Sequence, residues 1–152
     1  MSTINTSSNE LITCLKGLLD HENDMIANLA NASALLFQTL PELNWAGFYL
    51  YKNDELVLGP FQGKVACMHI PLGKGVCGTS ALHKECLRVD NVHEFPGHIA
   101  CDGASNSEIV IPLLKENTLI GVLDIDSPVF QRFTQQDEDM LLQFCDVLVS
   151  SF

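Results

Sequence analysis

Two acidic side chains stand in a segment that is otherwise apolar. The stretch 119–126 reads Leu-Ile-Gly-Val-Leu-Asp-Ile-Asp, and strand alternation places Asp124 and Asp126 on one face, roughly 7 Å apart. If that face is enclosed, ionising both carboxyl groups is costly, so at least one pKa should rise. Glu108 begins the preceding apolar segment and can join them, and a carboxyl group protonated near neutral pH is what a general acid requires. A solvated strand end, with Asp126 capping the turn before Pro128, is the alternative.

Three of the six cysteines lie in or beside loops and are candidates for thiol chemistry. Cys101 falls in a long polar loop, where backbone N–H groups and His98 favour a thiolate and Asp102 opposes it. Cys67 and Cys77 also border loops. Because the thiolate is the reactive form, three accessible cysteines can pass between nucleophile, sulfenic acid and disulfide.

A zinc site is the competing interpretation of the same residues. The segments Cys67-Met68-His69 and His98-Ile99-Ala100-Cys101 supply two sulfurs and two imidazoles, with Cys77 spare. Zinc accepts such ligands, but the Cys-x-His spacing is poor and the sequence has no Cys-x-x-Cys pair. We therefore favour thiol chemistry and expect neither a metal nor a cofactor.

The other three cysteines and the tryptophan have a structural interpretation. Cys14, Cys86 and Cys145 sit among apolar residues in periodic segments, so we expect small buried side chains. Trp45 lies on one face of an expected strand. It is either part of the core or an aromatic wall against which a methylthio group would pack.

Helical periodicity marks both ends of the chain. The expected helices cover residues 8–40 with a break at 21–23, residues 79–84, and residues 134–149. Thr134 should cap the last helix, with Asp137 in the reciprocal position of a capping box. The short central helix should begin at Thr79, after a glycine-rich loop.

Strand alternation fills the middle of the chain. The expected strands cover residues 44–52, 55–58, 66–70, 87–89, 108–114 and 119–126. Gly59-Pro60 should end the second strand. In the first strand, Trp45 and Tyr49 share one face and Phe48 lies on the other. Helices at both ends and mainly antiparallel strands between them predict an α+β fold.

Composition sets the broad class. The chain has 152 residues, 47% of them hydrophobic, which suits one domain over residues 1–152 with residues 1–7 frayed. A formal net charge of −11 argues against nucleic acid and membrane surfaces as partners. With no signal-like N-terminus and no long apolar run, we expect a cytoplasmic protein.

Four motifs together resemble the free methionine-(R)-sulfoxide reductases, a family of GAF domains. They are Gly75-Val76-Cys77-Gly78-Thr79, Asp90-Asn91-Val92-His93, the stretch from Gly97 to Val110, and Gly121-Val122-Leu123-Asp124-Ile125-Asp126-Ser127. Gly-His-Ile-Ala-Cys-Asp followed by Ala-Ser-Asn-Ser-Glu-Ile-Val is highly specific to this family, whereas GAF sensors at large share only the fold. The resemblance runs from about Asn44 to the final helix. It implies a single GAF domain, with N- and C-terminal helices on one side of an antiparallel sheet and a loop-covered pocket on the other.

The resemblance also implies roles for particular residues. Cys101 matches the nucleophile, Cys67 the resolving cysteine, and Cys77 a third cysteine whose role is open. The family's substrate-binding residues fall on Trp45, Glu108, Asp124 and Asp126.

The implied reaction is the thiol-dependent reduction of free L-methionine-(R)-sulfoxide to methionine. Cys101 would become a sulfenic acid, Cys67 would condense with it to a disulfide, and a thioredoxin-like dithiol would restore both thiols. A homodimer is possible. The rival hypothesis is a GAF sensor that binds a small ligand without chemistry and would consume no reducing equivalents.

Overall fold

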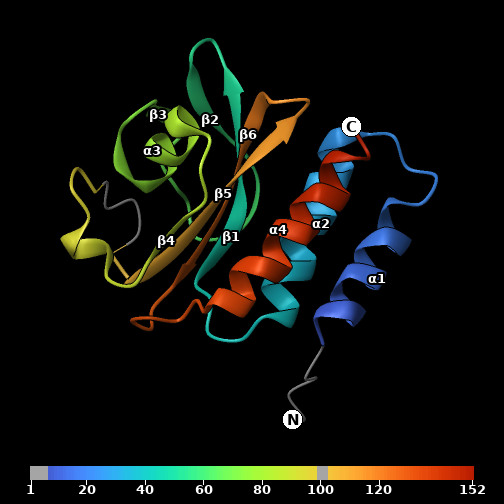
Figure 1. Ribbon diagram of the computed structural model, residues 1–152, viewed down its shortest axis with the longest axis horizontal. Helices are drawn as coiled ribbons and strands as arrows, with labels where there is room; N and C mark the ends of the chain where they lie inside the picture. Colours follow the sequence, from blue (N-terminus) through green and yellow to red (C-terminus); the bar gives the residue numbers. More distant parts are fainter. Residues whose placement is uncertain (1–6, 99–102) are drawn as a thin grey trace.

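The computed structural model describes residues 7–98 and 103–152. Within these ranges the helices are α1 (Ser8–Leu19), α2 (Met25–Thr39), α3 (Gly75–His83) and α4 (Gln135–Val149), with a 3-10 turn at Val92–Glu94. The strands are β1 (Trp45–Lys52), β2 (Glu55–Gly63), β3 (His69–Pro71), β4 (Leu87–Val89), β5 (Ser107–Lys115) and β6 (Thr118–Ser127). The strands form one antiparallel sheet in the order β3-β2-β1-β6-β5-β4 (Figure 1).

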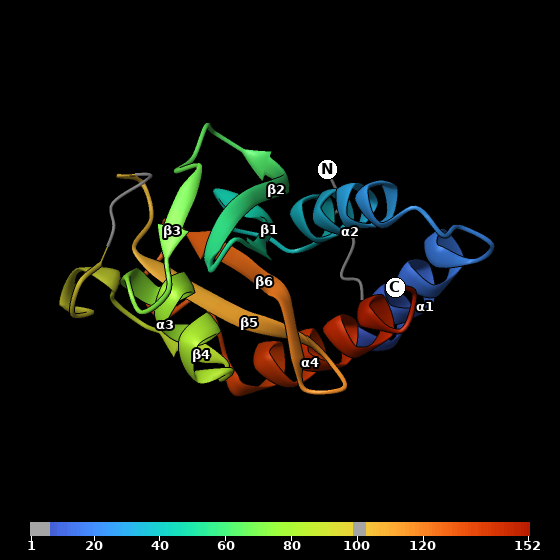
Figure 2. The same cartoon turned by 90° about the horizontal axis from the view of Figure 1, so that it is seen from above.

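The sheet separates two groups of elements. Figure 2 shows α1, α2 and α4 on one side of the sheet and α3 on the other. Strand alternation explains the division, because Phe48, Leu123 and Ile125 pack toward the three long helices, whereas Trp45 and Val122 belong to a second cluster with α3. The predicted α+β class and the predicted faces of the strands are therefore confirmed.

Side-chain caps fix the start of the long helices. Ser7 accepts a hydrogen bond from the Glu10 N–H, and Asp24 accepts one from the Ala27 N–H. At α4 the expected capping box is present, with Thr134 and Asp137 each accepting from the other's backbone N–H. The pair satisfies donors that the first turn of a helix leaves free.

The predicted start of α3 at Thr79 is wrong, because this helix begins at Gly75 after the Lys74 N-cap. A Cβ at Gly78 would lie 2.4 Å from the carbonyl oxygen of Pro71. The glycines that suggested a loop therefore serve the close packing of α3 on the end of β3, and tertiary contact overrides their low helix propensity.

The predicted end of β2 at Gly59-Pro60 is also wrong, since the strand continues to Gly63. The pairing of β1 with β2 shifts register between Gly47 and Tyr49, opposite this dipeptide. A proline at a bulge does not have to donate to the ladder, so the strand passes through it. The short strand β3 begins at His69 rather than at residue 66.

The burial of the three structural cysteines departs from expectation at one position. Cys145 is buried and Cys86 is intermediate, but Cys14 is exposed. On α1 the buried face is set by Leu11, Ile12 and Leu15, and Cys14 lies about 100° from the centre of that face at 100° per residue.

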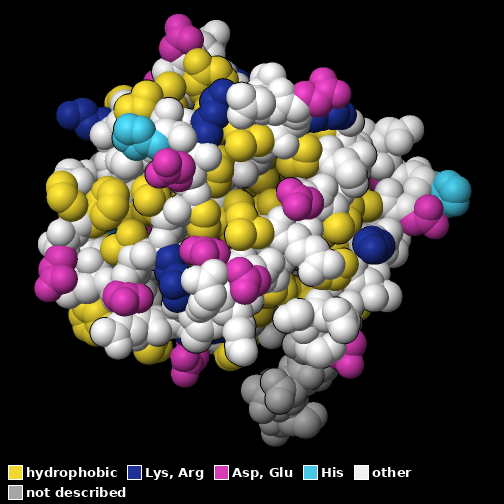
Figure 3. Space-filling view, viewed as in Figure 1, with side chains coloured by type: hydrophobic (Ala, Val, Ile, Leu, Met, Phe, Trp, Pro, Cys, Tyr) yellow, Lys and Arg dark blue, Asp and Glu magenta, His cyan; other side chains and the backbone are white. Residues whose placement is uncertain are grey.

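The surface carries the excess negative charge without concentrating it. Figure 3 shows Asp and Glu side chains scattered over one face of the molecule, among fewer Lys and Arg side chains. In the described ranges, no helix combines the length and the apolar character that crossing a membrane requires.

Candidate active site

Strand register brings the acidic side chains of the pocket together. Trp45 of β1 lies opposite Asp126 of β6, and Asp126 lies opposite Glu108 of β5. These three residues thus form a row across neighbouring strands on the face away from the long helices. Asp124 lies two residues before Asp126 on β6, opposite Gly47 of β1. The missing side chain of Gly47 allows Phe61 and the Trp45 ring to pack closely there.

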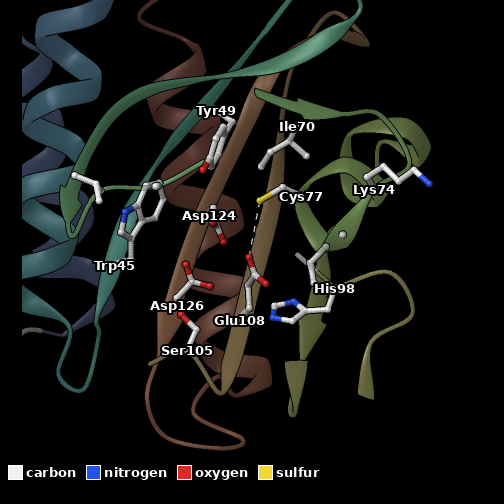
Figure 4. Close-up of a pocket in the computed structure, with 14 residues that line it drawn as sticks. Trp45, Tyr49, Ile70, Lys74, Cys77, His98, Ser105, Glu108, Asp124 and Asp126 are labelled. Carbon is white, nitrogen blue, oxygen red and sulfur yellow. Dashed lines mark hydrogen bonds between the residues drawn. The ribbon is translucent and has the colours of Figure 1, made fainter. Parts of the chain in front are cut away.

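The row forms the floor of a pocket that α3 and a loop enclose. Trp45, Tyr49, Glu108, Asp124 and Asp126 line it from the sheet, and Cys77 lines it from α3 (Figure 4). The space within the pocket is about 540 Å³ when its open mouth is included. Its aromatic wall is stacked, since the Trp45 ring lies 5.1 Å from Phe61 and 5.8 Å from Tyr49 between centroids.

Enclosure of this face has the electrostatic effect that the sequence predicts. Glu108 is 7% exposed and Asp124 is 6% exposed. Burial, followed by the charge of Asp124, raises the pKa of Glu108 well above its ordinary value. Burial, followed by the charge of Asp126, raises the pKa of Asp124 likewise. The cluster therefore retains protons at pH values where exposed carboxyl groups are ionised.

Cys77 belongs to this cluster as a thiol. Its Sγ lies 3.8 Å from Glu108 Oε2 and donates to it. Burial, followed by the charges of Asp124 and Glu108, raises the pKa of Cys77 well above its ordinary value. A thiol that resists ionisation is a poor nucleophile, so Cys77 is suited to hydrogen bonding rather than attack.

One acceptor in the cluster is left without a protein donor. Asp124 Oδ1 is fully buried and has no hydrogen-bond partner among the residues that the structure describes. A buried polar atom of this kind costs free energy unless a bound group satisfies it. Asp124 lines the pocket, so the geometry favours a polar or cationic ligand there.

Comparison with known proteins gives the family. A model of the GAF domain matches residues 18–151. The free methionine-R-sulfoxide reductase of Escherichia coli is 60% identical over 126 residues, which cover 83% of this chain and 76% of that protein. The chain belongs to the free methionine-R-sulfoxide reductase family.

Solved structures agree with this assignment. The structure of fRMsr of Staphylococcus aureus in its reduced form is 48% identical, with a TM-score of 0.94 over 99% of both chains. The free methionine-R-sulfoxide reductase of Neisseria meningitidis, solved in complex with its substrate, is 40% identical, with a TM-score of 0.92 over 95% of this chain and 87% of that one. The expectation of a GAF-type enzyme of this family is confirmed.

The loop that carries Cys67 is held to β1 by two aromatic side chains. Tyr49 donates its hydroxyl proton to the carbonyl oxygen of Cys67 at 2.9 Å, and Trp45 Nε1 donates to the carbonyl oxygen of Lys64 at 3.1 Å. Cys67 is disulfide-bonded, and the adjacent Ala66 lines the pocket. The loop therefore places Cys67, the expected resolving cysteine, next to a residue that lines the pocket.

The expected nucleophile, Cys101, lies outside the described residues. His98, which lines the pocket, is the last described residue before it in the chain. Burial, followed by the charge of His93, lowers the pKa of His98. A more neutral imidazole contributes less to stabilising a thiolate than the sequence suggested.

The sequence did not predict some pocket residues or the partner of one histidine. Tyr49 was placed on the face of Trp45 by strand alternation, yet nothing in the sequence showed its bond to the Cys67 loop. Ser105 carried no signal of its own but lines the pocket. His69, considered from the sequence as a candidate zinc ligand, lies with its Nδ1 2.8 Å from Glu55 Oε1.

Proposed function

We propose that this chain reduces free L-methionine-(R)-sulfoxide to methionine by thiol chemistry in the described pocket. The observation that carries the proposal is the buried carboxyl cluster of Glu108 and Asp124, which keeps protons beside an aromatic wall. A sulfoxide is reduced more readily when its oxygen is hydrogen-bonded and protonated, and such a cluster supplies the acid. The family relatives support the substrate.

The pocket matches the parts of a free amino acid. The methyl group of the substrate packs against Trp45, whose ring offers sulfur–aromatic contact. A carboxylate of the cluster binds the ammonium group, which a residue inside a peptide lacks. Asp124, with its unsatisfied Oδ1, is suited to this contact. Recognition of the ammonium group explains why free methionine sulfoxide would be preferred over a peptide.

In the chemical step, the Cys101 thiolate attacks the sulfoxide sulfur while a protonated carboxyl group hydrogen-bonds the oxygen and protonates it. The S–S bond formed in this attack and the substrate S–O bond then break as the oxygen passes to the Cys101 sulfur, so methionine leaves with its sulfur reduced and Cys101 becomes a sulfenic acid. Cys101 is thereby oxidised by two electrons. The raised pKa of Glu108 supports a role as this acid at neutral pH.

Recycling uses the second cysteine. The Cys67 thiol condenses with the sulfenic acid, which releases water and forms a disulfide. A thioredoxin-like dithiol then reduces this disulfide by exchange: it supplies two electrons and two protons, which restore both thiols, and it leaves as its own disulfide. The disulfide-bonded state of Cys67 supports this assignment.

Two serine substitutions test the proposed roles of Cys101 as nucleophile and Cys67 as resolving cysteine. Cys101→Ser should abolish methionine formation, because an alcohol is not ionised at neutral pH. Cys67→Ser should release about one methionine per chain and then stop, because the sulfenic acid has no thiol partner. Quantified methionine release in single-turnover and multiple-turnover assays measures both. Sustained activity of Cys101→Ser, or full recycling by Cys67→Ser in the absence of other thiols, would contradict the roles.

The sensor hypothesis gives a different result in the same assay. A sensor binds the sulfoxide but consumes no reducing equivalents from a thioredoxin system. Comparing the two sulfoxide epimers, free and in a peptide, tests the substrate: only the free R epimer should yield methionine at a substantial rate.

A further inference from the structure

We propose that Cys77, Glu108 and Asp124 form a binding site for one thiophilic divalent cation, Zn²⁺, which takes the place of the amino acid in the pocket. Within the described residues, a Cys77 Sγ and one carboxylate oxygen from each of Glu108 and Asp124 lie within 4.8 Å of one another. All three residues are buried. The site differs from the Cys–His combination that the sequence suggested.

The spacing suits a tetrahedral ion. Bond lengths of about 2.3 Å to sulfur and 2.0–2.2 Å to oxygen place a sulfur and an oxygen ligand about 3.5 Å apart around zinc. The separation of Cys77 Sγ from Glu108 Oε2 is 3.8 Å. Three protein ligands leave a fourth position toward the open pocket, as in zinc sites that exchange a ligand.

A second observation points to a ligand at the same place. Asp124 Oδ1 is buried and has no hydrogen-bond partner in the described part of the chain. Asp124 is only 6% exposed and lines the pocket beside Cys77 (Figure 4). A cation would provide the partner that this oxygen lacks.

The charge of the site also favours a dication. The ion pairs of the described residues join His and Arg side chains to acids outside the pocket: Asp20, Glu42, Glu55, Asp137 and Glu138. When Zn²⁺ binds, the aqua ion loses water, Cys77 loses its thiol proton to the buffer, and no electron is transferred.

Zinc binding is tested first on the oxidised chain, because a disulfide-bonded Cys67 cannot be a ligand. Zinc is titrated against a chromophoric chelator. We expect one zinc per wild-type chain and an affinity lower by on the order of 100-fold in Cys77→Ser, at least the loss seen when residues supporting a metal site are removed. Calorimetry in buffers of different ionisation enthalpy should show at least one proton released per zinc.

Cys86→Ser is the matched control. Cys86 Sγ lies 3.5 Å from Glu138 Oε1, so it also forms a cysteine–carboxylate pair, but that carboxylate is paired with Arg88. Cys86→Ser should bind zinc as the wild type does. Loss of zinc in this variant, or wild-type affinity in Cys77→Ser, overturns the proposed site.

Two further variants keep the test valid if Cys77→Ser folds poorly. Glu108→Gln and Asp124→Asn retain the thiol and nearly the same shape, yet each removes an anionic ligand. Both should weaken zinc binding at least tenfold, with circular dichroism showing an intact fold. Unchanged affinity in both overturns the assignment.

If zinc occupies the substrate pocket, it should inhibit methionine formation. This expectation rests on the proposed reductase function, whereas the measurement of zinc binding does not. In a single-turnover assay on reduced enzyme freed of excess dithiol, zinc should slow methionine formation, less so at high sulfoxide concentration, and a chelator should restore the rate. Zinc binding that does not slow the reaction would overturn the inference that zinc and the sulfoxide compete for the pocket. A chain that binds zinc but forms no methionine from any sulfoxide overturns the proposed function instead.

Discussion

At the scale of single residues, the pocket depends on acids that the fold holds in their neutral form. Burial raises the pKa of Glu108 and that of Asp124, and each is raised further by a neighbouring acid. The same surroundings raise the pKa of the Cys77 thiol. The cluster therefore retains protons, and Cys77 is a poor nucleophile, which is why the proposed mechanism assigns the attack to Cys101.

The raised pKa values predict how stability depends on pH. The unfolded Glu108 carboxyl titrates near about 4.3, and the folded one titrates higher. Folding therefore takes up a proton between these two pKa values, and the free energy of unfolding is greatest at the acidic end and falls as pH rises. Each such group contributes a slope of at most about 1.4 kcal/mol per pH unit.

Glu108→Gln should reduce that slope, because the amide cannot titrate but keeps a similar shape. Urea unfolding at several pH values from 5 to 8, at roughly unit steps, measures it. Glu10→Gln, in the exposed first turn of α1, is the control. An unchanged pH slope in Glu108→Gln would show that this carboxyl does not hold its proton in the folded chain.

At the scale of elements, β1 joins the pocket to the Cys67 loop. Its residues alternate between the helix core and the pocket face, and the two aromatic residues of β1 that line the pocket, Trp45 and Tyr49, donate hydrogen bonds to the loop. The loop lies outside the helices and strands, and the Leu58 N–H of β2 donates to the carbonyl oxygen of Met68 at its far end. The position of the segment between Lys64 and Cys67 therefore depends in part on these side-chain bonds.

Tyr49→Phe should weaken the step that needs the Cys67 loop more than the step that releases methionine. A hydrogen bond contributes about 0.5–1.5 kcal/mol, so steady-state turnover should fall several-fold further than the first turnover. Rapid-quench and steady-state methionine assays measure the two rates. Tyr51→Phe is the matched control, since the Tyr51 hydroxyl bonds only the nearby Asp54 side chain on the surface. Equal losses in both assays for Tyr49→Phe would contradict a positioning role.

Gly47 determines how closely β1 and β2 pack at the pocket. A Cβ at this position would lie 2.2 Å from Phe61 Cβ and 2.7 Å from Phe61 Cα. Gly47→Ala should therefore destabilise the chain by about 1–3 kcal/mol or more, as overpacking does. Gly17→Ala in α1, where a Cβ meets nothing within 4 Å, should instead stabilise it by about 0.5–1 kcal/mol. Urea unfolding compares the two, and equal effects would refute the steric explanation.

At the scale of the whole molecule, the sheet separates the larger hydrophobic core from the pocket. The larger core lies between the sheet and the long helices, and the pocket lies on the other face with α3. The helix-side core is entirely apolar at its centre, where Phe144 and Leu123 are fully buried. Substitutions there should act on folding without altering the groups that touch the substrate.

Phe144→Ala should cost about 3–5 kcal/mol in the free energy of unfolding, because it leaves a cavity in this core. Leu142→Ala, on the exposed side of the same helix, should change it by less than about 0.5 kcal/mol. Urea unfolding measures stability, and the KM for the sulfoxide at low temperature reports on the pocket. A large change of KM in the folded Phe144→Ala variant would show that the two faces are coupled.

The sequence determined the features that repeat locally along the chain. Period-two alternation assigned Trp45, Asp124 and Asp126 to one face of their strands, and a local capping signal at Thr134 located the start of α4. The raised pKa of a carboxyl group on this enclosed face also followed from the sequence. These features depend only on residue type and spacing, which the sequence contains in full.

Tertiary structure decided where distant segments meet. The register of β1, β6 and β5 placed Trp45, Asp126 and Glu108 in one row. Close packing against β3 allowed the glycine-rich segment to form α3, which positions Cys77 beside these acids. The hydrogen bond from Tyr49 to the Cys67 loop likewise joins residues with no local signal. Such contacts depend on strand order and close backbone approach, which arise only when the whole chain is packed.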